Sequence, residues 1–549
     1  MSFTLPAIHD GIASLVPDRE AVVTPNRRLS WAEFAERSRK LAWVLHGSGL
    51  GCHRARSALM PWESGQDHLG IYLYNCPEYL EAMVAAFRAR VAPFNVNYRY
   101  VEQELLYLLR DARPAAIVYH ASFAPRLAQV LPELRNVRLL LQVADDSGNA
   151  LLPGALDYET ALRDAPDEPL PFQPDPDDLY IVYTGGTTGQ PKGVLWRQED
   201  IFFAAMGGRV PGGTPVQNLE ELLQRVPYGG FMRILPAPPF MHGAGHWTAL
   251  MILHQGGTVV IPKEVRHLDP DDIWQTIERE KVFSLSIVGD AFAVPLLDQL
   301  ERKQYDLSSL RVIGSGGALL SPSVKAALLE RLPHVTVVDG FGSSETGAQG
   351  AAAASSASDV TSRFQMDADT VVLDERRLRV LQPEEREVGW IARKGYVPLG
   401  YLGDREKTER TFVTIEGVRY AVPGDRAHYA EDGSVVVLGR DSVCINTGGE
   451  KVYAEEVEQV LKKHPSVYDV LVTATPSERW GQQVTAVVAL RPGMRATAQE
   501  LRDFAARELA RYKLPRAVVF VDHVVRSPTG KPDYRWARQV ALEKLGISA

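Results

Sequence analysis

The stretch D-L-Y-I-V-Y-T-G-G-T-T-G-Q-P-K-G-V, from Asp178 to Val194, is the most informative part of the chain. Its apolar run, Leu179–Tyr183, has the length and β-branched character of a buried strand. Glycines, threonines and Lys192 follow, and free backbone N–H groups, hydroxyls and one cation suit a polyphosphate. A bare Gly/Thr run is usually a surface loop, but the preceding strand and the Pro-Lys-Gly ending favour phosphate binding. The segment is not a Walker A loop, because it contains no Gly-Lys-Ser/Thr.

This segment closely resembles the phosphate-binding loop of the acyl-adenylate-forming enzymes. That superfamily includes acyl-CoA synthetases, luciferases and the adenylation domains of peptide synthetases. The resemblance implies that the loop binds the phosphates of ATP. The residues to which it gives this role are Thr184, Gly185, Gly186, Thr187, Thr188, Gly189 and Lys192.

Length and composition set the class of protein. A chain of 549 residues is too long for one compact core, so we expect at least two domains. Its 45% apolar and 23% charged residues are typical of an ordinary globular protein. The net charge of −8 argues against nucleic-acid binding as the main function.

The cysteines and the N-terminus indicate the compartment. Cys52, Cys76 and Cys444 are widely spaced without a C-x-x-C pair, so we expect neither a disulfide framework nor a structural zinc site. Residues 1–20 lack a signal pattern, and no apolar run reaches ~18 residues. We therefore expect a cytoplasmic protein without a transmembrane segment. Peripheral contact with a membrane surface and a homodimer both stay open.

The order of apolar segments predicts an α/β fold. Strand-like and helix-like segments alternate, which implies a parallel sheet, and a compact α+β pattern follows Gly439. We expect a large N-terminal domain of layered α/β subdomains, residues 1–439, and a small mobile α+β C-terminal domain, residues 440–549. Predicted strands are Leu69–Tyr74, Ala115–Tyr119, Gly257–Ile261, Val282–Val288, Leu310–Gly314, Val467–Thr473, Val484–Leu490 and Ala517–Val521. Predicted helices open at the capping box Ser30–Glu33 or span Tyr79–Arg88, Glu102–Arg110, Pro270–Glu280, Ala454–His464 and Ala498–Ala510.

Two stretches depart from this alternation. Gly207–Gly230 is rich in glycine, proline and polar residues, which indicates an insertion or lid near a site. Ala351–Asp359 is a small Ala/Ser tract, which we expect to form a loop.

A second motif, Asp339–Gly347, follows the strand-like segment Val335–Val338. A strand ending in a Gly-rich turn with one acid can hold a nucleotide and its metal, although such glycines usually only make turns. In the family, the matching aromatic lies along adenine, the hydroxyl reaches the α-phosphate and the glutamate binds Mg²⁺. The resemblance gives these roles to Phe341, Ser344 and Glu345, and places Gly342 in the same turn.

Two weaker signals lie on either side of this motif. Gly316 and Gly317 follow another strand, and the resemblance implies that their backbone passes the adenine and one wall of the acyl pocket. An isolated Gly-Asp such as Gly424-Asp425 is usually a turn. In the family, however, this aspartate accepts both ribose hydroxyls, and the arginine matching Arg440 assists at the ribose and phosphate.

A further motif, Arg526–Lys531, lies near the C-terminus. A lone lysine there is by default a surface residue, but a Pro/Gly turn with the family's x-x-G-K pattern makes Lys531 the predicted adenylation lysine. The small domain would rotate between the two half-reactions about Asp441 or Ser442, taking Lys531 away and presenting the loop at 448–449.

His242 is the least certain of the site residues. It is either a packed core histidine or, as in the family, a gate between the acyl pocket and a thiol tunnel. Trp196 is equally open between a pocket wall and the core. Gln198 stands where many relatives carry a histidine, so that feature is not transferred.

The resemblance implies an acid–CoA ligase that uses ATP, Mg²⁺ and coenzyme A. The segments Lys192–Asp200 and Gly439–Val452 look most like bacterial fatty-acyl and steroid-side-chain CoA ligases, so a lipophilic acid is the predicted substrate. An aryl or amino acid, for which Asp290 is a candidate ligand, and a separate carrier protein as acceptor stay open. A non-catalytic nucleotide-binding protein is a further alternative. A serine hydrolase is disfavoured because no G-x-S-x-G elbow occurs.

Overall fold

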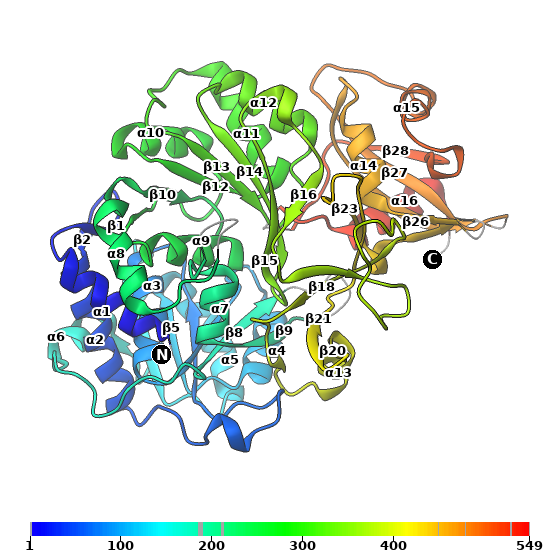
Figure 1. The fold of residues 1–549 in the computed structure, drawn as a ribbon. Coiled ribbons are helices and arrows are strands. Elements are labelled where there is room, and N and C mark those ends of the chain that lie inside the picture. Colours follow the sequence, from blue (N-terminus) through cyan, green and yellow to red (C-terminus); the bar gives the residue numbers. More distant parts are fainter. Residues whose placement is uncertain are drawn as a thin grey trace.

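The computed structural model describes residues 3–184, 190–209, 214–447, 450–477, 479–527 and 530–547. A large body contains two β-sheets with helices between and outside them, and a small body is built on a third sheet (Figure 1). The predicted α/β class is thus confirmed. The small sheet starts at β24 (Ile445–Thr447), shortly after β23 (Val435–Arg440). On this basis we propose residues 439 and 440 as the boundary between the domains.

One sheet of the large body contains the first motif. β8 (Leu179–Thr184) is the predicted strand, and it pairs antiparallel with β9 (Lys192–Arg197). The central residues of both strands are apolar and buried, because helices α2 (Trp31–Gly47) and α3 (Pro77–Arg88) lie on one face of the sheet and α4 (Glu102–Ala112) and α5 (Ala124–Val130) on the other. The remaining strands are β3 (His68–Tyr72), β4 (Ala92–Asn95), β5 (Ala116–His120), β6 (Leu139–Val143), β7 (Leu156–Asp157) and β19 (Gly400–Tyr401).

The other sheet of the large body begins as a parallel sheet and continues as an antiparallel one. Its outer face is covered by α10 (Pro270–Glu280), α11 (Gly289–Arg302) and α12 (Pro322–Arg331). Helices α3, α7 (Gln198–Ala205) and α9 (Gly243–Leu253) lie between the two sheets (Figure 1). The parallel strands are β1 (Glu20–Val23), β11 (Thr258–Val260), β10 (Arg233–Pro236), β12 (Ser284–Ile287), β13 (Val312–Gly316) and β14 (Thr336–Ser343). The antiparallel part adds β15 (Gly347–Ala354), β16 (Arg363–Met366), β17 (Thr370–Leu373), β18 (Gly389–Lys394), β20 (Phe412–Ile415), β21 (Val418–Ala421), β22 (Asp425–Tyr429) and β23. At the opposite edge, β2 (Arg28–Ser30) pairs antiparallel with β1.

The loop predicted at Ala351–Asp359 is wrong. Its first part belongs to β15, which pairs antiparallel with β14, and only the short 3-10 helix Ala357–Asp359 follows. The pairing with β14 explains why this tract forms a strand, because small residues on both strands let the two backbones approach closely. A Cβ on Gly342 would lie 2.2 Å from the Gly347 carbonyl oxygen. The strand predicted to end at Val338 accordingly runs on to Ser343.

The segment predicted as an insertion or lid is partly helical. Leu219–Arg225 forms α8, and a 3-10 helix spans Val226–Phe231. Helix α8 packs on α1 (Leu5–Leu15), and Arg19 donates to the Val226 carbonyl at 2.8 Å. This half of the segment therefore braces the N-terminal helix.

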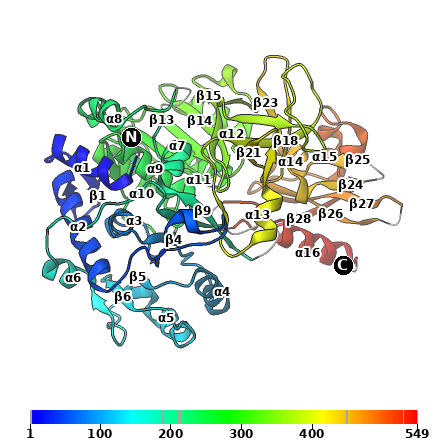
Figure 2. The same ribbon diagram turned by 60° about the horizontal axis from the view of Figure 1, so that its bottom comes forward.

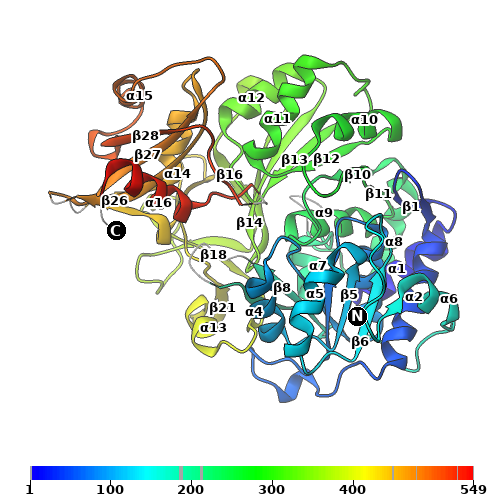
Figure 3. The same ribbon diagram turned by 180° about the vertical axis from the view of Figure 1, so that it is seen from behind.

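The small domain is a three-layer α+β unit. Val470 and Val472 of β26 (Val467–Ser477) face α14 (Ala454–Lys462), whereas Leu471 faces α16 (Tyr534–Leu545). Figures 2 and 3 show α14 and α16 on opposite faces of the sheet. Its other elements are β24, β25 (Glu450–Val452), β27 (Gly481–Leu490), α15 (Ala498–Ala505) and β28 (Ala517–Val521).

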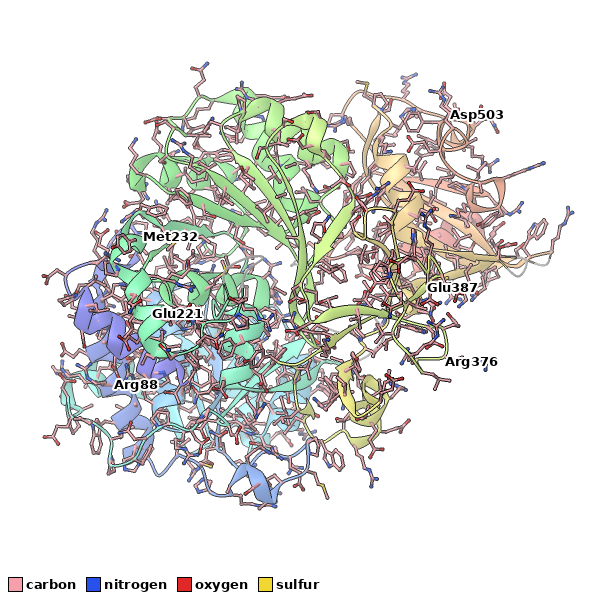
Figure 4. The ribbon with its side chains drawn as sticks, viewed as in Figure 1. Arg88, Glu221, Met232, Arg376, Glu387 and Asp503 are labelled. Atoms are coloured by element: carbon pink, nitrogen blue, oxygen red, sulfur yellow. The ribbon has the colours of Figure 1, made fainter. Side chains whose placement is uncertain are left out.

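The small domain sits at one end of an elongated molecule. Asp503 on α15 of the small domain lies at the upper right of Figure 4, and Arg88 on α3 lies at the left, across the large domain. Along the described ranges, no helix combines the length and the apolar character needed to cross a membrane.

Candidate active site

The hairpin of β8 and β9 presents the first motif. Thr184 and Lys192 face each other across it, and Gly185–Gly189, predicted to bind phosphate, lie outside the described residues. Lys192 Nζ lies 3.7 Å from Asp404 Oδ2 and 3.9 Å from Asp111 Oδ1. Burial acts to lower the pKa of Lys192, but Asp111 and the other neighbouring groups raise it overall. The lysine therefore stands charged at the base of the loop.

The turn between β14 and β15 presents Glu345, which is buried, with only 8% of its surface exposed. The Tyr401 hydroxyl donates to Glu345 Oε1 at 2.8 Å. Trp196 Nε1 donates to the Ser344 carbonyl at 2.9 Å. Because Trp196 lies on β9 and Tyr401 on β19, which pairs with β9, the turn is fixed to the strands of the first motif.

Trp196 is therefore a core residue that orients the turn, since its side chain is fully buried. Of the two readings of this residue, the core is the one that its burial supports.

The glycines and the aromatic residue of the nucleotide motifs lie on adjacent strands. Gly316 of β13 pairs with Gly340 of β14, and Gly317 has φ +85°, a conformation that favours glycine. Phe341 follows on β14, half-buried, with its ring centroid 5.6 Å from that of Phe364. Gly316, Gly317 and Phe341 thus come together at one end of the sheet, next to the turn that holds Glu345.

Asp425 and Arg440 face each other in the register of β22 and β23. Arg440 Nε lies 3.5 Å from Asp425 Oδ1. Burial raises the pKa of Asp425 although Arg440 opposes the shift. The pKa of Arg440 is raised, chiefly by the charge of Asp425. The two residues form an ion pair at the edge of the large domain.

Lys531 comes to this site from the small domain. Its segment rests on α11, because Gly530 has φ +74° and a Cβ there would lie 2.9 Å from Ala291 Cβ. Enclosure between the domains and the charge of Arg440 lower the pKa of Lys531, while Glu345 and Asp425 raise it. Lys531 is nevertheless exposed to solvent, which limits the desolvation of its amino group.

His242 caps the N-terminal end of α9. Its Nε2 has no hydrogen-bond partner among the described residues. Burial, and then the charges of Lys531 and Arg99, hold the pKa of His242 well below its usual value. The imidazole is thus neutral, and it lies close enough to Lys531 to sense its charge.

Two other predicted positions have structural partners. Gln198 is fully buried, and its side chain accepts from the Leu5 amide at 2.9 Å. Asp290 accepts from the Ser321 amide at 2.8 Å and pairs with Lys462 Nζ at 2.8 Å. A carboxylate with these partners is a poor candidate for binding a substrate amino group, so this reading of Asp290 loses its support.

Two residues near Glu345 were missed from the sequence. Tyr401 donates to the carboxylate, and Lys407 Nζ lies 4.0 Å from the Tyr401 ring centroid. Gly400-Tyr401 is the only local signal, and a Gly-aromatic pair is common in turns. The contact with Glu345 spans 56 residues and depends on the pairing of β19 with β9.

Comparison with known proteins identifies the family of this chain. Residues 12–402 match the family model "AMP-binding enzyme", and residues 456–531 match "AMP-binding enzyme C-terminal domain". The chain is 52% identical to the medium-chain acyl-CoA ligase Mig of Mycobacterium avium, over 98% of each chain. It is 43% identical to a medium/long-chain-fatty-acid–CoA/3-oxocholest-4-en-26-oate–CoA ligase of Mycobacterium marinum, over 95% of this chain and 94% of that one.

A solved structure has the same fold. The anthranilate CoA ligase AuaEII, in complex with anthranoyl-AMP, is 20% identical and superimposes with a TM-score of 0.82, covering 100% of this chain and 98% of the other. Both family models, the curated relatives and the shared fold agree with the motifs described above. The chain therefore belongs to the AMP-binding enzyme family, in the branch of the acyl-CoA ligases.

Proposed function

We propose that this protein is an ATP-dependent acid–CoA ligase for a lipophilic carboxylic acid. The acid is a medium- or long-chain fatty acid or a steroid side-chain acid, the classes named for relatives at 52% and 43% identity. The observation that carries the proposal is that Glu345 and Asp425 lie within electrostatic range of Lys531, although the three come from distant parts of the chain and from both domains. An acyl transfer through an adenylate needs a metal ligand, a ribose ligand and a cation at one place.

The nucleotide would lie across the ends of β13, β14 and β22. Phe341 would cover the adenine, with the backbone of Gly316, Gly317 and Gly342 beside it. Asp425 would accept the ribose hydroxyls, and Arg440 would assist at the ribose and phosphate. The groups assigned to the phosphates are Ser344, Lys192, Thr184, Gly185, Gly186, Thr187, Thr188 and Gly189.

Glu345 fits the coordination of Mg²⁺. Its Oε1 accepts from Tyr401, and its other carboxylate oxygen accepts no hydrogen bond from the described residues. Mg²⁺ prefers oxygen ligands and often combines one carboxylate with substrate phosphates. When bound, the ion would offset the charge of the triphosphate. The protein's part is to hold the carboxylate in place through Tyr401 and the β14–β15 turn.

The reaction has two halves. An oxygen of the substrate carboxylate attacks the α-phosphorus, the bond to the β-phosphate oxygen breaks, and pyrophosphate leaves with the bonding electrons. Lys531 would stabilise the charge that moves between the carboxylate and the α-phosphate. In the second half, the thiolate of coenzyme A attacks the acyl carbon and AMP leaves. Neutral His242 would stand between the acyl pocket and the path of the thiol without adding charge.

The test of this function is acid-dependent ATP–pyrophosphate exchange over a panel of octanoate, palmitate, a steroid side-chain acid, benzoate and amino acids. We expect exchange with the fatty or steroid acids, and thioester formation when coenzyme A is added. Exchange only with benzoate or amino acids would redirect the substrate assignment. Nucleotide binding without exchange for any acid would contradict the proposed ligase activity and favour a non-catalytic nucleotide-binding protein.

Replacing Asp425 with asparagine is expected to raise the KM for ATP about 10- to 100-fold, because hydrogen bonds to a charged acceptor are worth roughly 1.5–3 kcal/mol. Burial raises the pKa of Asp425, so the wild-type carboxylate takes up a proton at higher pH than an ordinary aspartate. The KM for ATP of the wild type should therefore rise as the solution becomes acidic. In Asp425→Asn the KM for ATP should no longer show this rise at acidic pH. An unchanged pH profile would contradict the assignment of Asp425 to the ribose site.

A further inference from the structure

A chain of charged side chains crosses the boundary between the domains outside the nucleotide site. Lys462, the last residue of α14, places Nζ 2.8 Å from Oδ2 of Asp290 at the start of α11. The Lys462 and Asp290 side chains are 5% and 10% exposed. Asp290 Oδ1 accepts from the Ser321 amide, which fixes the carboxylate toward the small domain. A buried pair with this geometry is sensitive to the loss of either partner.

The chain of charges continues to the segment that carries the catalytic cation. Lys462 Nζ lies 3.6 Å from Asp469 Oδ1. Asp469 holds the Arg526 guanidinium through two hydrogen bonds of 2.7 Å. Arg526 Nη1 in turn donates to the Gly530 carbonyl at 3.3 Å, and Arg526 forms a β-bridge with Pro532. Ion pairs, continued by a hydrogen bond and a backbone bridge, therefore connect the large domain to the residues on both sides of Lys531.

Both ends of this chain meet the large domain at one place. Gly530 packs against Ala291, the residue after Asp290. The ion pair and the contact of the Lys531 segment thus share the first turn of α11. A displacement of the small domain would separate Lys462 from Asp290 and Lys531 from the active site together.

We propose that Lys462 is a positioning residue, whose ion pair with Asp290 holds the small domain in the arrangement that supports adenylation. The inference rests on the proposed function, since it assigns the pair to one of its two half-reactions. In the arrangement described here Lys531 lies within electrostatic range of Glu345 and Asp425, so losing the pair penalises this arrangement. An arrangement in which the small domain has turned away would not need the pair.

Two single variants test the pair from opposite sides. Lys462→Met keeps most of the side-chain stem and removes the charge. Asp290→Asn removes the charge and keeps an oxygen acceptor for the Ser321 amide. We expect either variant to lower the kcat of ATP–pyrophosphate exchange by about tenfold or more, because it leaves a charge without its partner in the docked arrangement. Thioester formation from a supplied acyl-adenylate and coenzyme A should keep its rate.

The matched control is Lys463→Met, one residue further along the chain. Lys463 pairs with Glu508 inside the small domain, so its loss should leave both half-reactions unchanged. In the double variant Lys462→Met/Asp290→Asn, neither member of the Lys462–Asp290 pair stays charged opposite a neutral partner, and Asp469 keeps its ion pair with Arg526. We therefore expect a smaller loss than the product of the two single effects. Thermal unfolding of each full-length variant checks that the fold is retained.

The outcomes separate this inference from the proposed function. Absence of acid-dependent exchange in the wild type would contradict the function itself. Normal exchange in the wild type and in both single variants would overturn only the role of the pair. An equal loss of both half-reactions in Lys462→Met and Asp290→Asn would also overturn it, because general damage does not distinguish the two halves.

Discussion

Lys531→Ala is expected to lower acid-dependent ATP–pyrophosphate exchange by about 10²–10³-fold or more. Loss of one preorganised donor to a transition-state charge has this effect, and the variant also removes the positive charge that we assign to Lys531. The segment that carries it is fixed by Arg526 and by the packing of Gly530 on α11, so no neighbouring lysine can take its place without rebuilding the segment. Single-turnover formation of the acyl-adenylate is the direct measurement.

The same variant should largely spare thioester formation from a supplied acyl-adenylate, because pyrophosphate has already left that substrate. Lys544→Ala is the control, since Lys544 is exposed on α16 of the same domain. An equal loss of both half-reactions in Lys531→Ala would contradict the assignment of this lysine to adenylation.

Glu345→Gln is expected to lower exchange roughly a hundredfold and to raise the Mg²⁺ concentration needed for half-maximal rate. Glutamine keeps the size of the side chain and an oxygen that can accept from Tyr401, so the main change is the loss of negative charge. The measurement is the exchange rate over a range of MgCl₂ concentrations at fixed ATP. An unchanged Mg²⁺ dependence would mean that Glu345 does not ligate the metal.

Tyr401→Phe separates the charge of Glu345 from its orientation. It removes the hydroxyl that donates at 2.8 Å and keeps the carboxylate. We expect a loss of about tenfold, at the lower end for one hydrogen bond to a charged group, because the carboxylate keeps its charge. A loss as large as that of Glu345→Gln would show that orientation, rather than charge, is the main contribution of this pair.

The sequence predicted those parts of the fold that depend on local pattern. Helix α10 and strand β28 have the predicted bounds, because Asp269 and Pro270 mark the helix start and a β-branched run marks the strand. The motif residues Phe341, Glu345 and Asp425 were assigned to the site through a family resemblance, because local sequence patterns alone do not distinguish them from ordinary turn residues. Strand β15 was missed because alanine and glycine favour no strand until β14 lies beside them.

The long-range contacts of the site could not be predicted from the sequence for a different reason. Tyr401 approaches Glu345, and Lys462 approaches Asp290, across 56 and 172 residues. Nothing near either partner in the chain indicates the other, since each contact depends on how sheets and domains dock. Asp290 shows the consequence: it was considered as a ligand for an amino group, whereas its carboxylate faces a lysine of the small domain.

The division of the site between two domains has a consequence for bound ATP. The large domain holds the residues assigned to the nucleotide and its metal, but the cation assigned to the chemistry arrives only with the small domain. Nucleotide held by an undocked large domain would therefore be chemically idle. On these assignments, nucleotide binding would depend on the large domain alone, whereas reaction of the bound nucleotide would also require the small domain to dock.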